Sequence, residues 1–161
     1  MKGLFFHFLW VIDMIKTSTG LAAAMMVTGS FVSTMNLCKI KIFGGTVAAD
    51  ADAAETGTLL VTITNAGTAT GLTWEAAAVG RAAVKKTSET WSGTAVAGTA
   101  TPATYFRIVA AADTGVLSTT EKRVQGSVGN VAGVDLFLTN PNITTSDVKT
   151  LAAFSVTLPT N

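Results

Sequence analysis

From Leu37 to the C-terminus, the sequence alternates between short runs of β-branched and apolar residues and turns made of Gly, Asn, Asp and Thr. Runs of about four to eight such residues, bounded by turn signals, are typical of strands. No helical pattern long enough to connect parallel strands separates them. We therefore predict a mostly β fold, an antiparallel β-sandwich or jelly roll with a short helical N-terminal segment.

The runs predict about nine strands, which together would form a domain over residues 37–161. They are Leu37–Ile42, Leu59–Thr64, Leu72–Glu75, Gly80–Lys85, Thr90–Gly93, Tyr105–Val109, Arg123–Val128, Val134–Leu138 and Phe154–Leu158. The core is expected to hold the inward-facing apolar residues Leu59, Val61, Ile63, Trp74, Trp91, Phe106, Ile108, Val124, Leu136, Leu138, Phe154, Val156 and Leu158.

Residues 14–36 predict a helical segment ahead of the strands. A helix is expected over Leu21–Val27, with Thr17, Ser18 and Thr19 as candidate N-caps and Gly29 as the stop.

A second helical turn is expected over Phe31–Met35. Because isolated helices shorter than about 12–15 residues rarely persist in water, the segment should pack on the strands or on a neighbouring subunit. The candidate interface residues are Leu21, Met25 and Phe31.

Residues 1–13 form an apolar extension, in which the run Leu4–Ile12 is ended by Asp13. The run is too short to span a membrane, which takes about 20 apolar residues. A signal peptide cleaved near Ala22–Ala24, an amphipathic anchor and an over-extended gene start are the alternatives. We favour the last, with the true start at Met14.

Side chains that perform chemistry are scarce. The chain has one His (His7), one Cys (Cys38) and one Tyr (Tyr105), so we expect no enzyme and no cofactor. Cys38 has no disulfide partner and is expected to be a small buried apolar residue. Charged residues make up 13% of the chain and the net charge is +1, without a basic patch, so neither nucleic acid nor a membrane is an expected partner.

One acidic cluster, Asp50, Asp52 and Glu55, is a weak candidate for a metal site, because hard cations bind carboxylates that lie close together. It lacks the ligand spacing of an EF-hand loop, and a solvated turn is the preferred interpretation. Asp113-Thr114-Gly115 predicts a turn in which the carboxylate bonds the backbone two residues on.

The aromatic residues Trp74, Trp91 and Tyr105 admit two interpretations. They would line a sugar-binding groove, or they would anchor the core. Trp91 lies within a predicted strand beside small residues, which favours the core.

Six segments, taken in order, are similar to a family of small structural proteins encoded by tailed bacteriophages and prophages. The segments are Ile42–Gly45, Ala49–Leu60, Gly71–Ala77, Thr90–Val96, Ala103–Arg107 and Phe154–Pro159. The resemblance covers the chain from Met14 to its end, and residues 1–13 depart from the family pattern. It implies a virion component and supplies no catalytic residue.

On this basis we expect a non-enzymatic virion protein, first of all a capsid-associated decoration or cement protein. The alternatives are a neck or tail component, such as an adaptor or terminator ring, and a carbohydrate-binding adhesin or fibre domain. The expected partners are other virion proteins, namely capsid or neck and tail subunits, in a homo-oligomer or other symmetric assembly.

Overall fold

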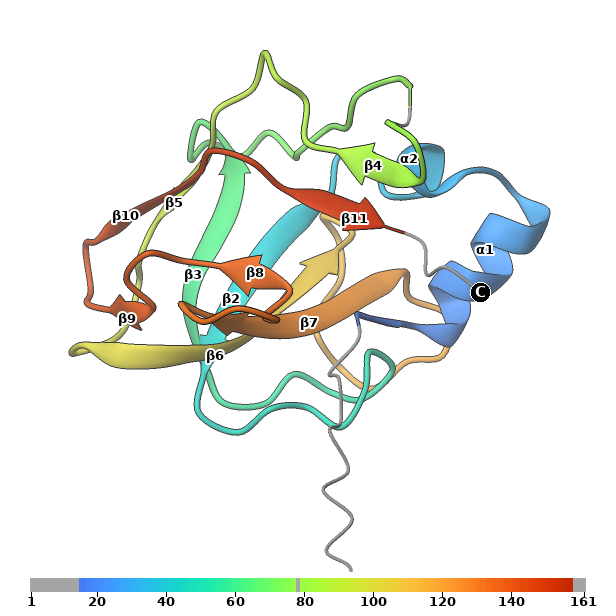
Figure 1. Cartoon of the computed structure of the whole chain (residues 1–161). Coiled ribbons are helices and arrows are strands. Elements are labelled where there is room, and N and C mark those ends of the chain that lie inside the picture. Colours follow the sequence, from blue (N-terminus) through green and yellow to red (C-terminus); the bar gives the residue numbers. More distant parts are fainter. Residues whose placement is uncertain (1–14, 78, 158–161) are drawn as a thin grey trace, which may run out of the picture.

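The computed structural model describes residues 15–77 and 79–157, so the extension 1–13 and the predicted core residue Leu158 lie outside it. The fold is mostly β, as predicted (Figure 1). In chain order the described elements are β1 (Lys16–Thr17), α1 (Thr19–Val27), α2 (Phe31–Thr34), β2 (Lys39–Gly44), β3 (Thr58–Asn65), β4 (Ala82–Val84), β5 (Trp91–Thr94), β6 (Thr101–Val109), β7 (Arg123–Gly129), β8 (Leu136–Phe137), β9 (Asn142–Ile143), β10 (Val148–Leu151) and β11 (Ser155–Thr157).

Nine of these strands form one sheet. Its hydrogen-bonded neighbours follow the order β1-β7-β6-β2-β3-β5-β10, while β8 pairs with β7 and β9 pairs with β6. The pairs are antiparallel except β7–β8, which is parallel. The sheet curls around its core, so that β8 from one end and β10 from the other line the same cleft (Figure 1). A separate two-stranded sheet joins β4 and β11.

The helical segment lies against the N-terminal end of β7, and Ser18 holds it there. The Ser18 hydroxyl caps α1 by accepting the Leu21 N–H at 3.1 Å, accepts the Arg123 N–H at 2.9 Å and donates to the Glu121 carbonyl at 2.7 Å. Of the three predicted N-caps, Ser18 is therefore the one used. The helix ends at Val27 and α2 follows, close to their predicted positions.

The main core lies inside the curl and is built around large aromatic side chains. Trp91 is fully buried and meets Trp74 edge to face, with ring centroids 5.2 Å apart. Phe154 packs against both tryptophans and against Phe106. Among the described residues, each predicted core residue is buried with the exception of Leu59.

Leu59 is half-buried because β3 carries a bulge. Ile42 of β2 pairs with Val61, but the next residue of β2, Phe43, pairs with Leu59, so Leu60 is the extra residue. A bulge changes the phase of the side-chain alternation. As a result Leu60 and Val61 both reach the main core, while Leu59 joins a second small cluster on the other face with Phe43.

Several strand predictions need correction. The short strands β1 and β9 were not predicted, and two further differences concern residues 72–75 and β10. Residues 72–75 form only isolated bridges, in which Leu72 pairs with Cys38 and Trp74 pairs with Lys85. Because Cys38 and Lys85 belong to different parts of the chain, the bridges do not continue into a strand. Strand β10 was not predicted, since Val148–Leu151 alternates too weakly to indicate a strand. Pairing with β5 creates it.

The bulge makes a testable prediction about two adjacent leucines. Leu60→Ala should lower the free energy of unfolding by about 2–5 kcal/mol, because it opens a cavity in the main core. Leu59→Ala, the matched control, should cost clearly less. Urea unfolding of both variants measures the difference, and equal losses would contradict the bulged register.

Candidate functional site

The three carboxylates of the predicted metal cluster lie in the loop between β2 and β3, residues 46–57, and each serves a different partner. Asp50 accepts the backbone N–H of Asp52 at 2.9 Å. Asp52 accepts the N–H and the hydroxyl of Thr19 at 2.9 and 2.6 Å. Glu55 forms an ion pair with Lys41 at 2.8 Å. Within residues 15–77 and 79–157, no group of three or more His, Cys, Asp and Glu side chains is placed to hold a metal ion.

The same loop covers the sheet face opposite the main core, and a buried arginine of β6 fastens it there. The guanidinium of Arg107 donates to the carbonyls of Asp50 and Ala53 at 2.7 and 2.8 Å, and to the Gln125 side chain at 2.9 Å. Gln125 in turn donates to the Ala48 carbonyl at 2.8 Å. Burial lowers the pKa of Arg107 from its ordinary value, and the carbonyls supply the acceptors that this cation has lost from water.

A second buried arginine, Arg123 of β7, binds the carboxylate of Asp113 through two nitrogens at 2.6 and 2.7 Å. It also donates to the Val116 carbonyl at 2.7 Å. Burial alone would raise the pKa of Asp113, but the hydrogen bonds from Arg123 and from the Gly115 N–H outweigh it and hold that pKa below its ordinary value. The predicted Asp113-Thr114-Gly115 turn is confirmed, with the Gly115 N–H 2.8 Å from Asp113 Oδ1.

These buried charges form a structural cluster. Every buried side-chain nitrogen and oxygen in the described part of the chain has a hydrogen-bond partner. Local sequence patterns do not connect the residues of this cluster to one another. The available signal was a charged residue in the middle of the apolar run Tyr105–Val109, since a buried charge needs a partner.

The aromatic candidates for a sugar-binding groove are buried. Trp74 donates its indole N–H to the Met35 carbonyl at 3.0 Å, and Trp91 donates to Glu89 at 2.9 Å. Tyr105 lies on the opposite face, stacked on a phenylalanine, and donates to the Thr56 carbonyl at 2.6 Å. The core interpretation is confirmed for both tryptophans, and the three rings do not share a surface.

Cys38 is fully buried next to β2, as expected for a small apolar residue. Burial raises the pKa of its thiol to about 12, so it stays protonated and unreactive at neutral pH.

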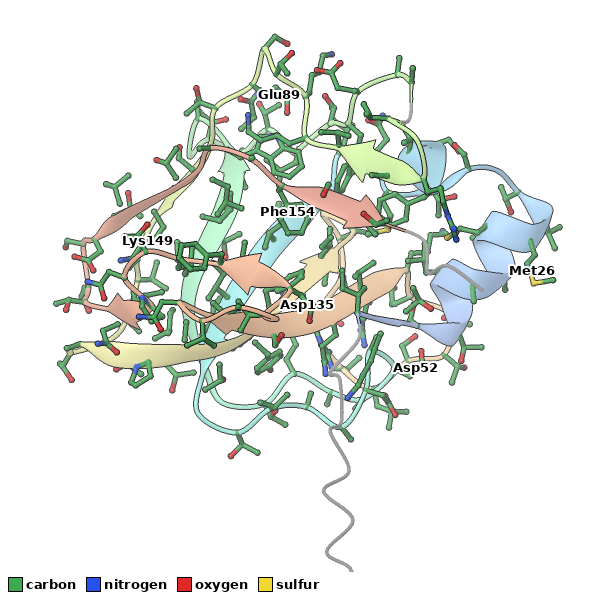
Figure 2. The ribbon with its side chains drawn as sticks, in the orientation of Figure 1. Met26, Asp52, Glu89, Asp135, Lys149 and Phe154 are labelled. Carbon is green, nitrogen blue, oxygen red and sulfur yellow. The ribbon has the colours of Figure 1, made fainter. Side chains whose placement is uncertain are left out.

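The helix α1 presents an apolar surface, although one predicted interface residue is not part of it. Leu21 is fully buried in the main core, because the Ser18 cap turns it toward the sheet. Met25 and Phe31 are half-buried and line an apolar groove of about 330 Å³. The surface residues are Met26 and Val27, each 87% exposed, and Figure 2 shows Met26 pointing away from the molecule.

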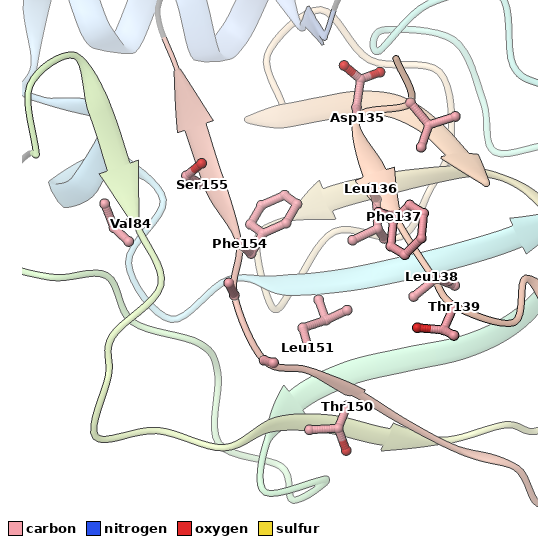
Figure 3. Close-up of a pocket in the computed structure, with 13 residues that line it drawn as sticks. Val84, Asp135, Leu136, Phe137, Leu138, Thr139, Thr150, Leu151, Phe154 and Ser155 are labelled. Carbon is pink, nitrogen blue, oxygen red and sulfur yellow. The ribbon is translucent and has the colours of Figure 1, made fainter. Parts of the chain in front are cut away.

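A larger cleft, about 600 Å³ in volume, lies where the two ends of the curled sheet approach each other. We call it the seam, and define it by Leu136–Thr139 on one side and Leu151–Ser155 on the other. Figure 3 shows the two sides running in opposite directions, with Leu136, Leu151 and Phe154 along the floor. Phe137 stands at the rim with 60% of its surface exposed.

Comparison with protein-family models, with curated proteins and with solved structures finds no match for this chain. Among the helices of residues 15–77 and 79–157, none is long and apolar enough to cross a membrane.

The buried pair Asp113–Arg123 predicts a pH dependence. The folded pKa of Asp113 lies below its unfolded value of about 3.9, so the ionised form stabilises the fold above about pH 4. That contribution is lost as the pH falls through the folded pKa. Asp113→Asn should cost about 3–5 kcal/mol at pH 7, because Arg123 keeps its charge without a counter-ion.

Urea unfolding at pH 7, 5, 4 and 3 provides the measurement. The free energy of unfolding of the wild type should fall more steeply with acid than that of Asp113→Asn. Glu121→Gln is the control and should keep the wild-type slope. Parallel curves for the wild type and Asp113→Asn would contradict the role given to this pair.

Proposed function

We propose that the protein is a non-enzymatic structural component of a tailed-bacteriophage virion, with capsid-associated decoration or cement as the favoured role. The observation that carries the proposal is the apolar surface of α1, where Met26 and Val27 are each 87% exposed. Contiguous apolar patches on a surface mark interaction sites, and these two exposed side chains lie next to the apolar groove that Met25 and Phe31 line. The resemblance of six sequence segments to phage structural proteins supports the same role.

The internal use of the charged groups favours a structural role over an enzymatic one. Four charged side chains are buried among the described residues: Lys85, Arg107, Asp113 and Arg123. The last three hold the loop 46–57 or its neighbours in place, and Lys85 donates to the carbonyls of Lys86 and Glu89. Catalytic sites concentrate perturbed and buried ionisable groups around an accessible pocket. Here the buried groups face one another and backbone carbonyls.

Of the two alternatives, the carbohydrate-binding adhesin is the less favoured, because the aromatic residues that suggested it are buried. Trp74, Trp91 and Tyr105 are each at most 4% exposed, so these aromatic rings cannot stack on a sugar. A neck or tail component remains the second candidate, because a ring of subunits uses the same kind of apolar surface. We also propose that the curled sheet is a variant of the sandwich or jelly-roll arrangement, since its inward faces pack on one another across one core.

Copy number separates the capsid role from the neck role. Quantitative mass spectrometry of purified particles should find the protein at hundreds of copies if it decorates the capsid. Six or twelve copies would favour the neck, and absence from particles would overturn the proposed localisation in the virion.

The surface of α1 predicts how the protein associates. Val27→Asp should abolish retention on particles or homo-oligomer formation, because it places a charge in an apolar contact. Val96→Asp, at an exposed valine after β5, is the matched control and should associate like the wild type. Sedimentation of particles with bound protein provides the measurement.

Ionic strength tests the nature of the contact. With charged residues at only 13% of the chain, retention should change little from about 0.05 to 1 M salt, since there are few surface charges to screen. Release at moderate salt would show that an electrostatic surface, and not α1, carries the association.

A further inference from the structure

We infer that the seam binds a neutral saccharide of one or two sugar rings. The seam shares no lining residue with the apolar groove beside α1, and the buried rings of Trp74, Trp91 and Tyr105 are not part of its lining. Saccharide binding is thus an activity in addition to the proposed structural role. It requires only that the assembly leaves the seam open to solvent.

The seam has the size and the form of a small-ligand site. Its volume of about 600 Å³ lies within the range of roughly 300–1,000 Å³ that is typical of such sites, which combine an apolar lining with a few polar groups. Leu136, Leu151 and Phe154 form the floor and belong to the main core, so packing fixes their positions. A bound molecule therefore meets a preformed surface.

Polar side chains stand at both ends of this apolar floor. Because the two sides run in opposite directions, Thr139 and Thr150 lie at one end, and Asp135 and Ser155 lie at the other (Figure 3). The three hydroxyls form no hydrogen bond with any residue that the structure describes. Asp135 accepts the N–H and the hydroxyl of Ser127 through Oδ2 alone, each at 2.8 Å, which leaves Oδ1 available to a ligand.

These groups match the hydrogen-bonding chemistry of a sugar. A Ser or Thr hydroxyl both donates and accepts a hydrogen bond, as a sugar hydroxyl does, and a carboxylate oxygen accepts from one. Two backbone donors lie on the same cleft, since the N–H groups of Ala152 and Ala153 are not bonded within residues 15–77 and 79–157. A molecule with hydroxyls at both ends can therefore engage the two ends of the seam at once.

Phe137 supplies an exposed aromatic ring at the rim. Its side chain is 60% exposed, whereas Phe154 on the other side of the seam is buried in the floor (Figure 3). The C–H face of a sugar ring packs on an aromatic ring through dispersion contacts and removes apolar surface from water. A ligand with one apolar face and a polar edge thus satisfies the ring, the floor and the hydroxyls together.

Two other classes of ligand match the seam less well. None of the described residues that line it is Lys, Arg or His, so it offers no cation to a phosphate or a carboxylate. An added peptide strand obtains its affinity from a row of backbone hydrogen bonds. Here β8 has only two residues, and Ala152 and Ala153 follow the end of β10, so the free edges are short.

NMR of the backbone amides of isotope-labelled full-length protein tests the site. The probes are the neutral disaccharides cellobiose, maltose, lactose and diacetylchitobiose. At least one of them should shift the signals of β8, Ala152 and Ala153 in a saturable way and leave those of α1 unchanged. Glucose and glucuronic acid form a matched pair, in which the acid should give the smaller shifts because Asp135 repels it.

Three substitutions locate the ligand within the seam. Phe137→Ala should weaken binding by about tenfold, because the ligand loses the exposed ring. Leu117→Ala, which also shortens an exposed apolar side chain but lies outside the seam, is the control and should bind like the wild type. Thr139→Val keeps the shape and removes the hydroxyl, and should weaken binding by about two- to tenfold. Since Phe137 and Thr139 are exposed, the variants should keep the wild-type thermal midpoint, which separates lost binding from lost folding.

The possible results differ clearly. The absence of saturable shifts at the seam with every disaccharide would overturn the proposal, and so would unchanged binding by Phe137→Ala. An equal response to glucose and glucuronic acid would contradict the neutral class of ligand. If an extended peptide of alternating Thr and Val shifted the same signals and the sugars did not, the strand edges would be the binding feature instead. Copy number and retention on particles do not enter these measurements, so the structural role is tested separately.

Discussion

The buried guanidinium of Arg123 is the interaction on which the rest of the structure depends. Its side chain binds Asp113 and the Val116 carbonyl, and its backbone N–H binds the hydroxyl that caps α1. One residue thus joins β7, the loop that follows β6 and the helical segment. Since a buried cation without acceptors is very costly, these three parts of the chain are obliged to stay together.

Arg107 extends the same constraint to the loop 46–57. Because its acceptors are backbone carbonyls of that loop, the loop has one favourable position on the sheet. The loop shields the outer face, where Tyr105 and Phe43 stack 4.8 Å apart. Two cores of unequal size result, one inside the curled sheet and one beneath the loop.

Exposed apolar side chains on α1 are the surface feature that directs the functional proposal. The buried charged side chains bind partners within the fold, whereas Met26 and Val27 of α1 and Phe137 at the rim of the seam are exposed to solvent. In a nearly neutral chain, such surfaces favour association through packing and backbone hydrogen bonds. A structural subunit uses contacts of this kind, and this is the reason for the role that we propose.

Local patterns of the sequence were sufficient for the class of fold and for most of the core. Some features depend only on neighbours within a few residues, and the sequence alone can therefore predict them. They are the alternation in β3 and β6, the Ser18 cap and the Asp113 turn. Trp74 and Trp91 could be assigned to the core because large rings among small residues need a packed environment.

The candidate site was less predictable, because its parts are distant in the sequence. Whether Asp50, Asp52 and Glu55 converge depends on Thr19 and Lys41, which no spacing rule connects to them. The exposure of Met26 in place of Leu21 follows from the direction in which Ser18 anchors α1.

By itself, then, the sequence determined most of the longer strands, the Asp113 turn and most apolar residues of the core, since periodicity and turn chemistry are local. Only the tertiary structure decided the bulge at Leu60, the pairing of β10, the buried arginine cluster and the open seam. Each of these arises where segments far apart in the chain meet, and the free energy of such a meeting depends on both partners at once.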